Sequence, residues 1–272
     1  MSVIARDFPG SELVPEQPSS MMFLGEVLSV VEAATSWLYF YRYPFPRVPR
    51  AIGKTVLLIP GFMASDLTLM PMASFCGYLG HRSKFAGILS NSRCPRETLE
   101  LLVAKLGRMY ELGGQRIVII GQSLGGLYAR MLAIRHPEMI ERVITLGTPI
   151  NSPLQSSHPA VTALAARVGK FNGKAEGCLT QSCRCGLMLS DLVTREVPVT
   201  VVYSRRDGIV HWQSCVDRTG SANVDNEEVI STHVGMGISA DVCQVVADRL
   251  ALPRSERKSP LIDYSPAETP QH

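Results

Sequence analysis

The sequence predicts an α/β fold, in which a mostly parallel sheet of about six strands carries helices on both faces. Short runs of branched apolar residues, such as residues 116–120 (RIVII) and 198–203 (PVTVVY), are typical of strands that are buried on both faces. Longer runs with helical periodicity alternate with these strands along the chain. This alternation favours parallel strands, because parallel neighbours must be joined by a long crossover that is usually a helix.

The expected strands are short apolar runs that end in Gly, Pro or Ser, or shortly before one. They cover residues 54–60, 85–89, 116–120, 142–146, 198–203 and 228–231. The expected helices have apolar residues at three- and four-residue spacing. They cover residues 22–41, 68–79, 96–112, 127–135, 159–168 and 239–250. Pro71 suits the start of its helix, and Gly113 and Gly114 suit the end of theirs.

Composition divides the 272 residues into five parts. Residues 1–20 predict a flexible lead, 21–42 an amphipathic helix, and 51–252 one domain with a sizeable core. Residues 151–196 break the strand and helix alternation and predict a small lid or cap insertion over the sheet edge. Residues 253–272 are polar and contain four prolines, which predicts a disordered tail.

The formal net charge of +3 is too small to indicate a nucleic-acid partner. The polar, proline-rich start does not resemble a secretory signal, so we expect a cytoplasmic protein. In the helix of residues 22–41, Phe23 and Leu24 lie on the apolar arc, while Glu26 and Glu32 lie on the polar arc. We expect this helix to pack on the domain. Peripheral membrane contact through residues 21–50 is one alternative. A membrane span is the other, and it is disfavoured because each charged glutamate at the bilayer centre would cost about 2.5–3.5 kcal/mol.

The cysteines do not form a disulfide framework that can be predicted, because there are seven of them in a long chain. Cys178, Cys183 and Cys185 lie close together, but their spacing is not a standard zinc spacing. We expect buried or incidental thiols, no metal and no cofactor. A single disulfide or an adventitious metal site is the alternative.

A serine lies between two glycines in residues 121–125 (GQSLG), directly after an expected strand and before an expected helix. This G-x-S-x-G pattern is typical of a sharp strand-to-helix turn that exposes a nucleophilic hydroxyl. Ser123 should have a strained backbone, and side chains at 121 or 125 would collide with neighbouring backbone. The pattern predicts Ser123 as a nucleophile. An ordinary tight turn is the alternative.

A serine nucleophile needs a base, and the base needs an orienting acid. His233 follows the last expected strand, and Asp207 follows the strand of residues 198–203, so both should reach the edge where Ser123 lies. His211 is a rival base. Asp217 or Asp225 would replace Asp207 if the latter were only a turn residue.

The chain order Ser123, Asp207, His233 is that of α/β-hydrolases, and the segment from about Lys54 to Leu250 resembles that superfamily. The resemblance rests on LLIPGF, GQSLGG, HPEMIERVITLGTP, VVYSRRDGIV and STHVGMG. The LGTP segment and the small size resemble serine esterases and triacylglycerol lipases. The superfamily's first two strands are missing here, and Pro60 stands where many members have histidine.

The resemblance implies a serine hydrolase that cleaves carboxylic esters of lipophilic substrates through an acyl-enzyme. The amides of Leu124 and Phe62 would form the oxyanion hole, with Met63 next in line. Met63 and Gln122 are expected to line the site for a small ester or lipid substrate. An acyltransferase or thioesterase would use the same triad. A non-catalytic binding protein with this fold is the alternative from a different functional class.

Overall fold

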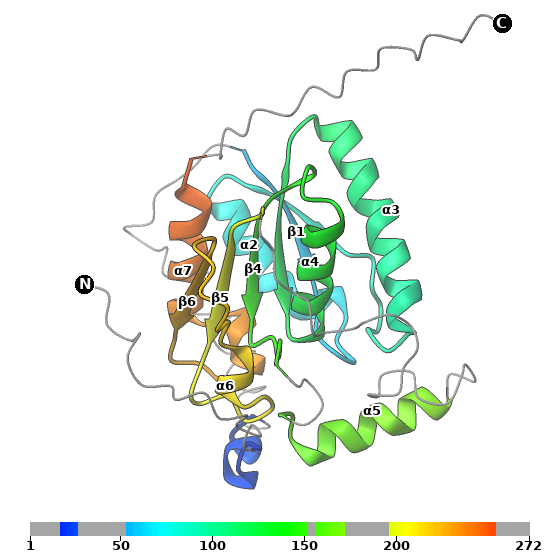
Figure 1. The fold of residues 1–272 in the computed structure, drawn as a ribbon, viewed down its shortest axis with the longest axis vertical. Helices are drawn as coiled ribbons and strands as arrows, with labels where there is room; N and C mark the ends of the chain where they lie inside the picture. The colour runs from blue at the N-terminus through cyan, green and yellow to red at the C-terminus, as the bar shows by residue number, and fades with distance from the viewer. Residues whose placement is uncertain (1–16, 27–52, 152–155, 172–195, 254–272) are drawn as a thin grey trace, which may run out of the picture.

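The computed structural model describes residues 17–26, 53–151, 156–171 and 196–253 (Figure 1). A six-stranded sheet forms its centre, with the order β2-β1-β3-β4-β5-β6 and every neighbouring pair parallel. The strands are β1 (Thr55–Ile59), β2 (Arg82–Phe85), β3 (Ile117–Gln122), β4 (Ile140–Leu146), β5 (Val199–Tyr203) and β6 (Val224–Glu228). The predicted α/β fold with a parallel sheet is confirmed.

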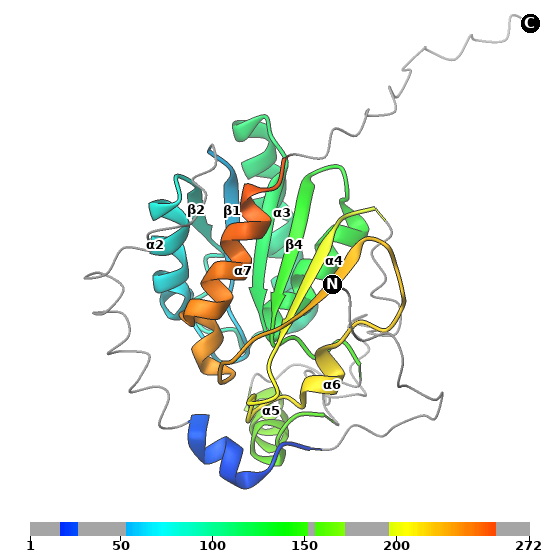
Figure 2. The ribbon, with the colours of Figure 1, turned by 90° about the vertical axis from the view of Figure 1, so that its left-hand side faces the viewer.

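Helices cover both faces of this sheet (Figures 1 and 2). Helices α3 (Pro95–Gly113) and α4 (Leu124–Arg135) pack on one face, and α2 (Met70–Tyr78) and α7 (Ala240–Ala251) pack on the other. Besides the N-terminal helix, the other described elements are α5 (Pro159–Phe171), α6 (Trp212–Cys215) and two 3₁₀ turns, η1 (Asp66–Leu69) and η3 (Val234–Gly237).

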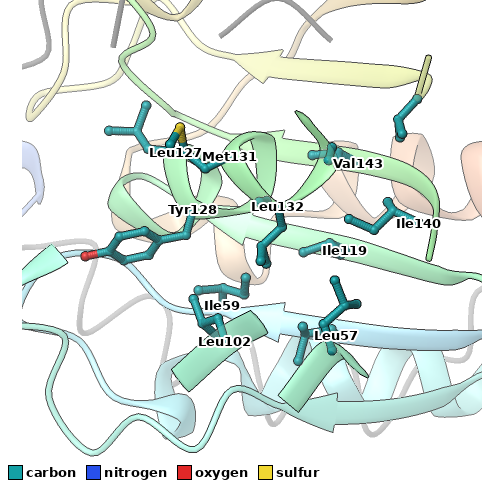
Figure 3. Close-up of a cluster of buried hydrophobic side chains, with 14 of the residues drawn as sticks. Leu57, Ile59, Leu102, Ile119, Leu127, Tyr128, Met131, Leu132, Ile140 and Val143 are labelled. Atoms are coloured by element: carbon teal, nitrogen blue, oxygen red, sulfur yellow. The ribbon is translucent and has the colours of Figure 1, made fainter. Parts of the chain in front are cut away.

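The inner strands supply side chains to two separate cores. Leu57 and Ile119 are paired across β1 and β3 and belong to the core under α3 and α4, which Figure 3 shows. The next pair, Leu58 and Ile120, belongs to the core under α2 and α7. Successive strand residues point to opposite faces, so a strand covered on both sides must be apolar throughout. This explains why these strands are continuous apolar runs in the sequence.

The two edge strands differ from their predicted positions. The strand expected at 85–89 is β2, residues 82–85, and the strand expected at 228–231 is β6, residues 224–228. Both have polar sequences, RSKF and VDNEE, and partly exposed side chains. An edge strand pairs on one side only and need not be apolar. Both predictions were shifted because they followed the apolar residues that lie next to each strand in the sequence.

The N-terminal helix begins at Ser20 and is described as far as Glu26. The expectation that Glu26 lies on the solvent side is wrong: this residue is 3% exposed, whereas Leu24 is 61% exposed. Periodicity shows that a helix has two arcs, but it cannot show that buried backbone amides elsewhere need a carboxylate. Within the described chain, no helix has the length and apolarity needed to cross a bilayer.

Several sequence expectations lie outside the described residues. They are most of the lead, the rest of the helix to residue 42, residues 172–195 of the insertion, the tail from 254, and Cys178, Cys183 and Cys185. The four cysteines that the structure describes, Cys76, Cys94, Cys215 and Cys243, are free. The division of the chain into five parts stays a prediction.

Two glycine substitutions should have opposite effects on stability. A Cβ at Gly121 would lie 2.4 Å from the carbonyl oxygen of Gly125, whereas one at Gly107 of α3 meets nothing within 4 Å. We expect Gly121→Ala to lower the free energy of unfolding by about 3 kcal/mol through overpacking. Gly107→Ala should raise it by about 0.5–1 kcal/mol through helix propensity. Urea titration measures both, and equal effects would contradict the packing described here.

Candidate active site

The turn from β3 into α4 holds Ser123 in a conformation that side chains rarely adopt. Its φ is 52° and its ψ is −119°, and α4 begins at the next residue. Strain of this kind costs about 1–3 kcal/mol and needs support from the surroundings. The amide of Ser123 donates to the carbonyl of Leu146 in β4 (2.8 Å), and the carbonyl of Ser123 accepts from the amide of Gly126 (2.9 Å).

The loop after β1 packs directly against this turn. A Cβ at Gly61 would lie 3.2 Å from Cβ of Ser123, and one at Gly125 would lie 2.2 Å from the carbonyl oxygen of Ile59. Of the described non-glycine residues, Ser123 and Met63 alone have positive φ, and Met63 belongs to this loop. Both strained residues therefore lie where the loop and the turn meet.

The expected oxyanion-hole amides lie on these two segments. Among the described residues, the amides of Phe62 and Leu124 have no hydrogen-bond partner. The amide of Leu124 is at the first position of α4, where backbone N–H groups and the helix dipole favour negative charge. The amide of Met63, the reserve candidate, already donates to the carbonyl of Asn91 (3.1 Å).

Asn91 holds the loop after β1, and sequence reasoning missed it. It is 1% exposed, and its Nδ2 donates to the carbonyl of Pro60 (2.7 Å). Its backbone amide donates to the carbonyl of Ala64 (2.9 Å) and its carbonyl accepts from Met63. Asn91 thus binds the loop at three points around Phe62. The only sequence signal was its place in a turn-rich stretch.

Asp207 and His233 form a buried hydrogen bond. Nδ1 of His233 lies 2.6 Å from Oδ2 of Asp207, and both side chains are almost fully buried. Oδ1 of Asp207 accepts from the amides of Ile209 (2.9 Å) and Val210 (2.7 Å), which fixes the carboxylate. Because Nδ1 faces a carboxylate, it carries the proton in the neutral ring and leaves Nε2 as the acceptor.

The electrostatic surroundings favour a protonated imidazole at His233. Burial lowers its pKa, but the charge of Asp207, the hydrogen bond to it, and the charge of Glu26 raise the pKa more strongly. The net result is a pKa above the ordinary value of 6.5. Such a histidine is a stronger proton acceptor than an exposed one.

The pair lies beside the turn that carries Ser123. Nε2 of Gln122 donates to the backbone carbonyl of His233 (2.9 Å), so the residue next to Ser123 is tied to the histidine loop. A Cβ at Gly147, at the end of the neighbouring strand β4, would lie 2.9 Å from Nδ1 of His233. Among the described residues, Oγ of Ser123 makes no hydrogen bond. Its contact with His233 stays a prediction, and such contacts often tighten only when substrate binds.

The rival residues have other partners. Asp217 forms a buried ion pair with Arg130 of α4, and Asp225 lies near Arg249 with its side chain 66% exposed. The amide of His211 donates to the carbonyl of Ser156, and this residue caps α6.

A mostly apolar cavity opens at Ser123. Helix α5, in the described part of the expected insertion, forms one wall of it. The lining residues are Phe62, Ser123, Leu124, Leu127, Pro149, Ser157, Val161, Thr162, Ala165, Ile209 and Val210. Met63 and Gln122 are not among them: Met63 is 44% exposed, and Gln122 is buried.

Comparison with known proteins identifies the fold. The family model for the alpha/beta hydrolase fold matches residues 97–187, which include the turn at Ser123. No curated protein matches the sequence. Together with the parallel sheet and the turn after β3, the family match shows that the chain has the α/β-hydrolase fold.

Solved structures agree with this assignment. A lipase of Bacillus licheniformis has a TM-score of 0.55 and 19% identity, over 77% of this chain and 95% of the lipase chain. Lipase B of Aspergillus fumigatus has a TM-score of 0.59 and 14% identity, over 76% of this chain and 56% of that one. A structure of metagenome-derived lipolytic enzymes has a TM-score of 0.54 and 18% identity, over 74% and 92% of the two chains. At these identities the likeness concerns the fold.

Removing the Asn91 side chain should loosen the loop after β1. We expect Asn91→Ala to lower the free energy of unfolding by about 1–3 kcal/mol, because the carbonyl of Pro60 loses its buried donor. Ser90→Ala is the matched control, since that hydroxyl is exposed and, among the described residues, bonds to Ser92. It should change stability by less than about 0.5 kcal/mol. Thermal unfolding followed by circular dichroism measures both variants, and a neutral Asn91→Ala would contradict the holding role.

Proposed function

We propose that this protein is a serine hydrolase that cleaves carboxylic esters of lipophilic substrates. Ser123 is the nucleophile, His233 the general base and Asp207 the orienting acid. The observation that carries the proposal is the buried Asp207–His233 hydrogen bond, tied through Gln122 to a positive-φ serine at a strand-to-helix turn. The fold supports it, because parallel α/β sheets gather function at the carboxyl ends of their strands.

The reaction has two stages. Oγ of Ser123 attacks the ester carbonyl while Nε2 of His233 takes its proton, and Asp207 supports the imidazolium that forms. His233 then gives the proton to the departing alcohol, and the acyl group stays on Ser123. In the second stage His233 activates a water that releases the acid and restores the serine. The amides of Phe62 and Leu124 stabilise the oxyanion in both stages.

The cavity supports an uncharged, lipophilic acyl group. The described residues that line it are mostly aliphatic or aromatic, and none of these carries a formal charge. A charged substrate would lose hydration there without finding a partner. The structural neighbours described as lipases point to the same substrate class. Membrane contact through residues 21–50 remains a prediction for the same chain.

Substitution of the nucleophile tests the function directly. Wild-type protein should react with a fluorophosphonate probe and hydrolyse p-nitrophenyl esters, and Ser123→Ala should lose the labelling and about 10³-fold or more of kcat. Ser90→Ala serves as a control with an unchanged site. Absence of wild-type labelling would favour a non-catalytic binding protein instead.

A panel of acceptors separates the reaction types. Ester hydrolysis predicts that added alcohols leave the free acid as the main product, and that thioesters are not preferred over oxygen esters. Product analysis by mass spectrometry distinguishes these outcomes. Predominant transfer to the alcohol would identify an acyltransferase, and a strong thioester preference would identify a thioesterase.

The pH profile follows from the charge state of His233. The base must be neutral to accept a proton, and its pKa lies above 6.5. We therefore expect kcat/KM to fall as the pH is lowered through a value above 6.5. Melting temperatures over the same pH range control for unfolding. An inflection at or below 6.5 in a folded enzyme would contradict the electrostatics described here.

A further inference from the structure

We propose that Glu26, on the N-terminal helix, is a positioning residue that holds two loops of the active site together. These are the loop that carries Asp207 (the acid loop) and the loop that carries His233 (the base loop). The proposal deepens the proposed hydrolase function and rests on it. It gives the N-terminal helix a supporting role in the site through this one side chain.

The carboxylate of Glu26 accepts three backbone hydrogen bonds from the two loops. Oε1 accepts from the amides of Gly208 (2.9 Å) and His233 (2.5 Å), and Oε2 accepts from the amide of Val234 (2.9 Å). Gly208 directly follows Asp207, so one carboxylate binds the backbone beside the acid and the backbone of the base. Hydrogen bonds from amides to an ionised carboxylate are about twice as strong as neutral ones.

The base loop needs this partner. His233 is the N-cap residue of the 3₁₀ turn η3, and its own side chain makes no capping hydrogen bond. Oγ1 of Thr232 accepts from the amide of Gly235 (3.1 Å), which leaves the amides of His233 and Val234 to another partner. The first amides of such a turn have no partner within it and cost free energy when they are buried without one. Glu26 accepts hydrogen bonds from the amides of His233 and Val234, although it lies 207 residues before His233 in the sequence. A shift of Glu26 would therefore move the backbone that carries the imidazole.

The helix is fitted closely to the site. A Cβ at Gly208 would lie 2.3 Å from the carbonyl oxygen of Met22, so only glycine lets the helix approach the acid loop. The ring of Phe23 stacks on His158 with 4.1 Å between centroids and 8° between planes. His158 immediately precedes α5, which walls the cavity. Figures 1 and 2 show the N-terminal helix at the same end of the sheet as α5 and α6.

The charge of Glu26 also acts on the base. Asp207 and Glu26 are the charged groups that raise the pKa of His233, and both belong to elements packed against it. Cys215 lies near Asp207, but burial holds its pKa well above the ordinary value of 9.0, so the thiol stays neutral. During acylation the imidazole becomes a cation, and a second buried carboxylate stabilises that cation.

Two substitutions separate the hydrogen bonds from the charge. Glu26→Gln keeps the length but removes the charge, and its single acceptor oxygen cannot serve all three amides. Glu26→Asp keeps the charge but is one methylene too short to reach both loops. We expect each to lower kcat by about 10-fold or more with KM little changed, because the imidazole is displaced. Only Glu26→Gln should move the acidic limb of kcat/KM to lower pH.

Two exposed substitutions serve as controls. Leu24→Gln alters the same helix at a residue that is 61% exposed, and Glu111→Gln removes an exposed carboxylate from α3. Both should keep wild-type kcat and the wild-type pH profile. A Glu26→Gln enzyme that is folded by circular dichroism and has the wild-type kcat and pH profile would overturn the proposal while leaving the hydrolase function intact.

Titration of the imidazole gives a readout that does not depend on turnover. In histidine-labelled protein, NMR should show a lower pKa for His233 in Glu26→Gln than in the wild type, with the signal assigned by its loss in His233→Asn. If the wild type lacks Ser123-dependent hydrolysis, the hydrolase function fails, and an unchanged His233 pKa would still overturn the role of Glu26. Should Glu26→Gln not fold, a wild-type kcat in Glu26→Asp would overturn it instead.

Discussion

The strand-to-helix turn at Ser123 brings three backbone segments into contact, and the arrangement of the site depends on that contact. The end of β3, the start of α4 and the loop after β1 approach so closely that Cβ atoms at Gly121 or Gly125 would overlap backbone atoms. The positive φ of Ser123 is tolerated because the apolar cores on the two faces of the sheet hold β3 and α4 in place. The approach places the amides of Phe62 and Leu124 on the two segments that meet there. Backbone strain and the proposed nucleophile therefore coincide at one turn.

Buried backbone amides and carbonyls at this edge of the sheet are satisfied by side chains from distant parts of the chain. Asn91 donates to a carbonyl in the loop after β1, and Gln122 donates to the carbonyl of His233. Glu26 accepts from the amides of Gly208, His233 and Val234. A loop that reaches over a sheet edge leaves polar groups that neither strand nor helix can pair. Each such side chain fixes one loop relative to another. The site is thus held by a set of polar contacts above an apolar core.

The opposite end of the sheet has buried charge with a structural role. Lys54 precedes β1, and its Nζ lies 2.6 Å from Oε1 of Glu141 in β4 and donates to the carbonyl of Leu252 (2.7 Å). This contact ties the last helix to the start of the sheet. It lies at the amino ends of the strands, opposite the edge of the sheet that holds Ser123. Charge therefore supports packing at one end of the sheet and the site at the other.

The sequence by itself determined the fold class and the inner strands, and it predicted a nucleophile, an acid and a base. It could do so because a strand covered on both faces must be apolar, and because the turn after β3 admits only glycine two positions before and two positions after Ser123. Tertiary structure alone decided the edge strands, the pairing of Asp207 with His233, and the roles of Asn91 and Glu26. Those features depend on which backbone groups become buried without partners once the layers have packed. A carboxylate counted as solvent-facing on its own helix can meet that need from 207 residues away.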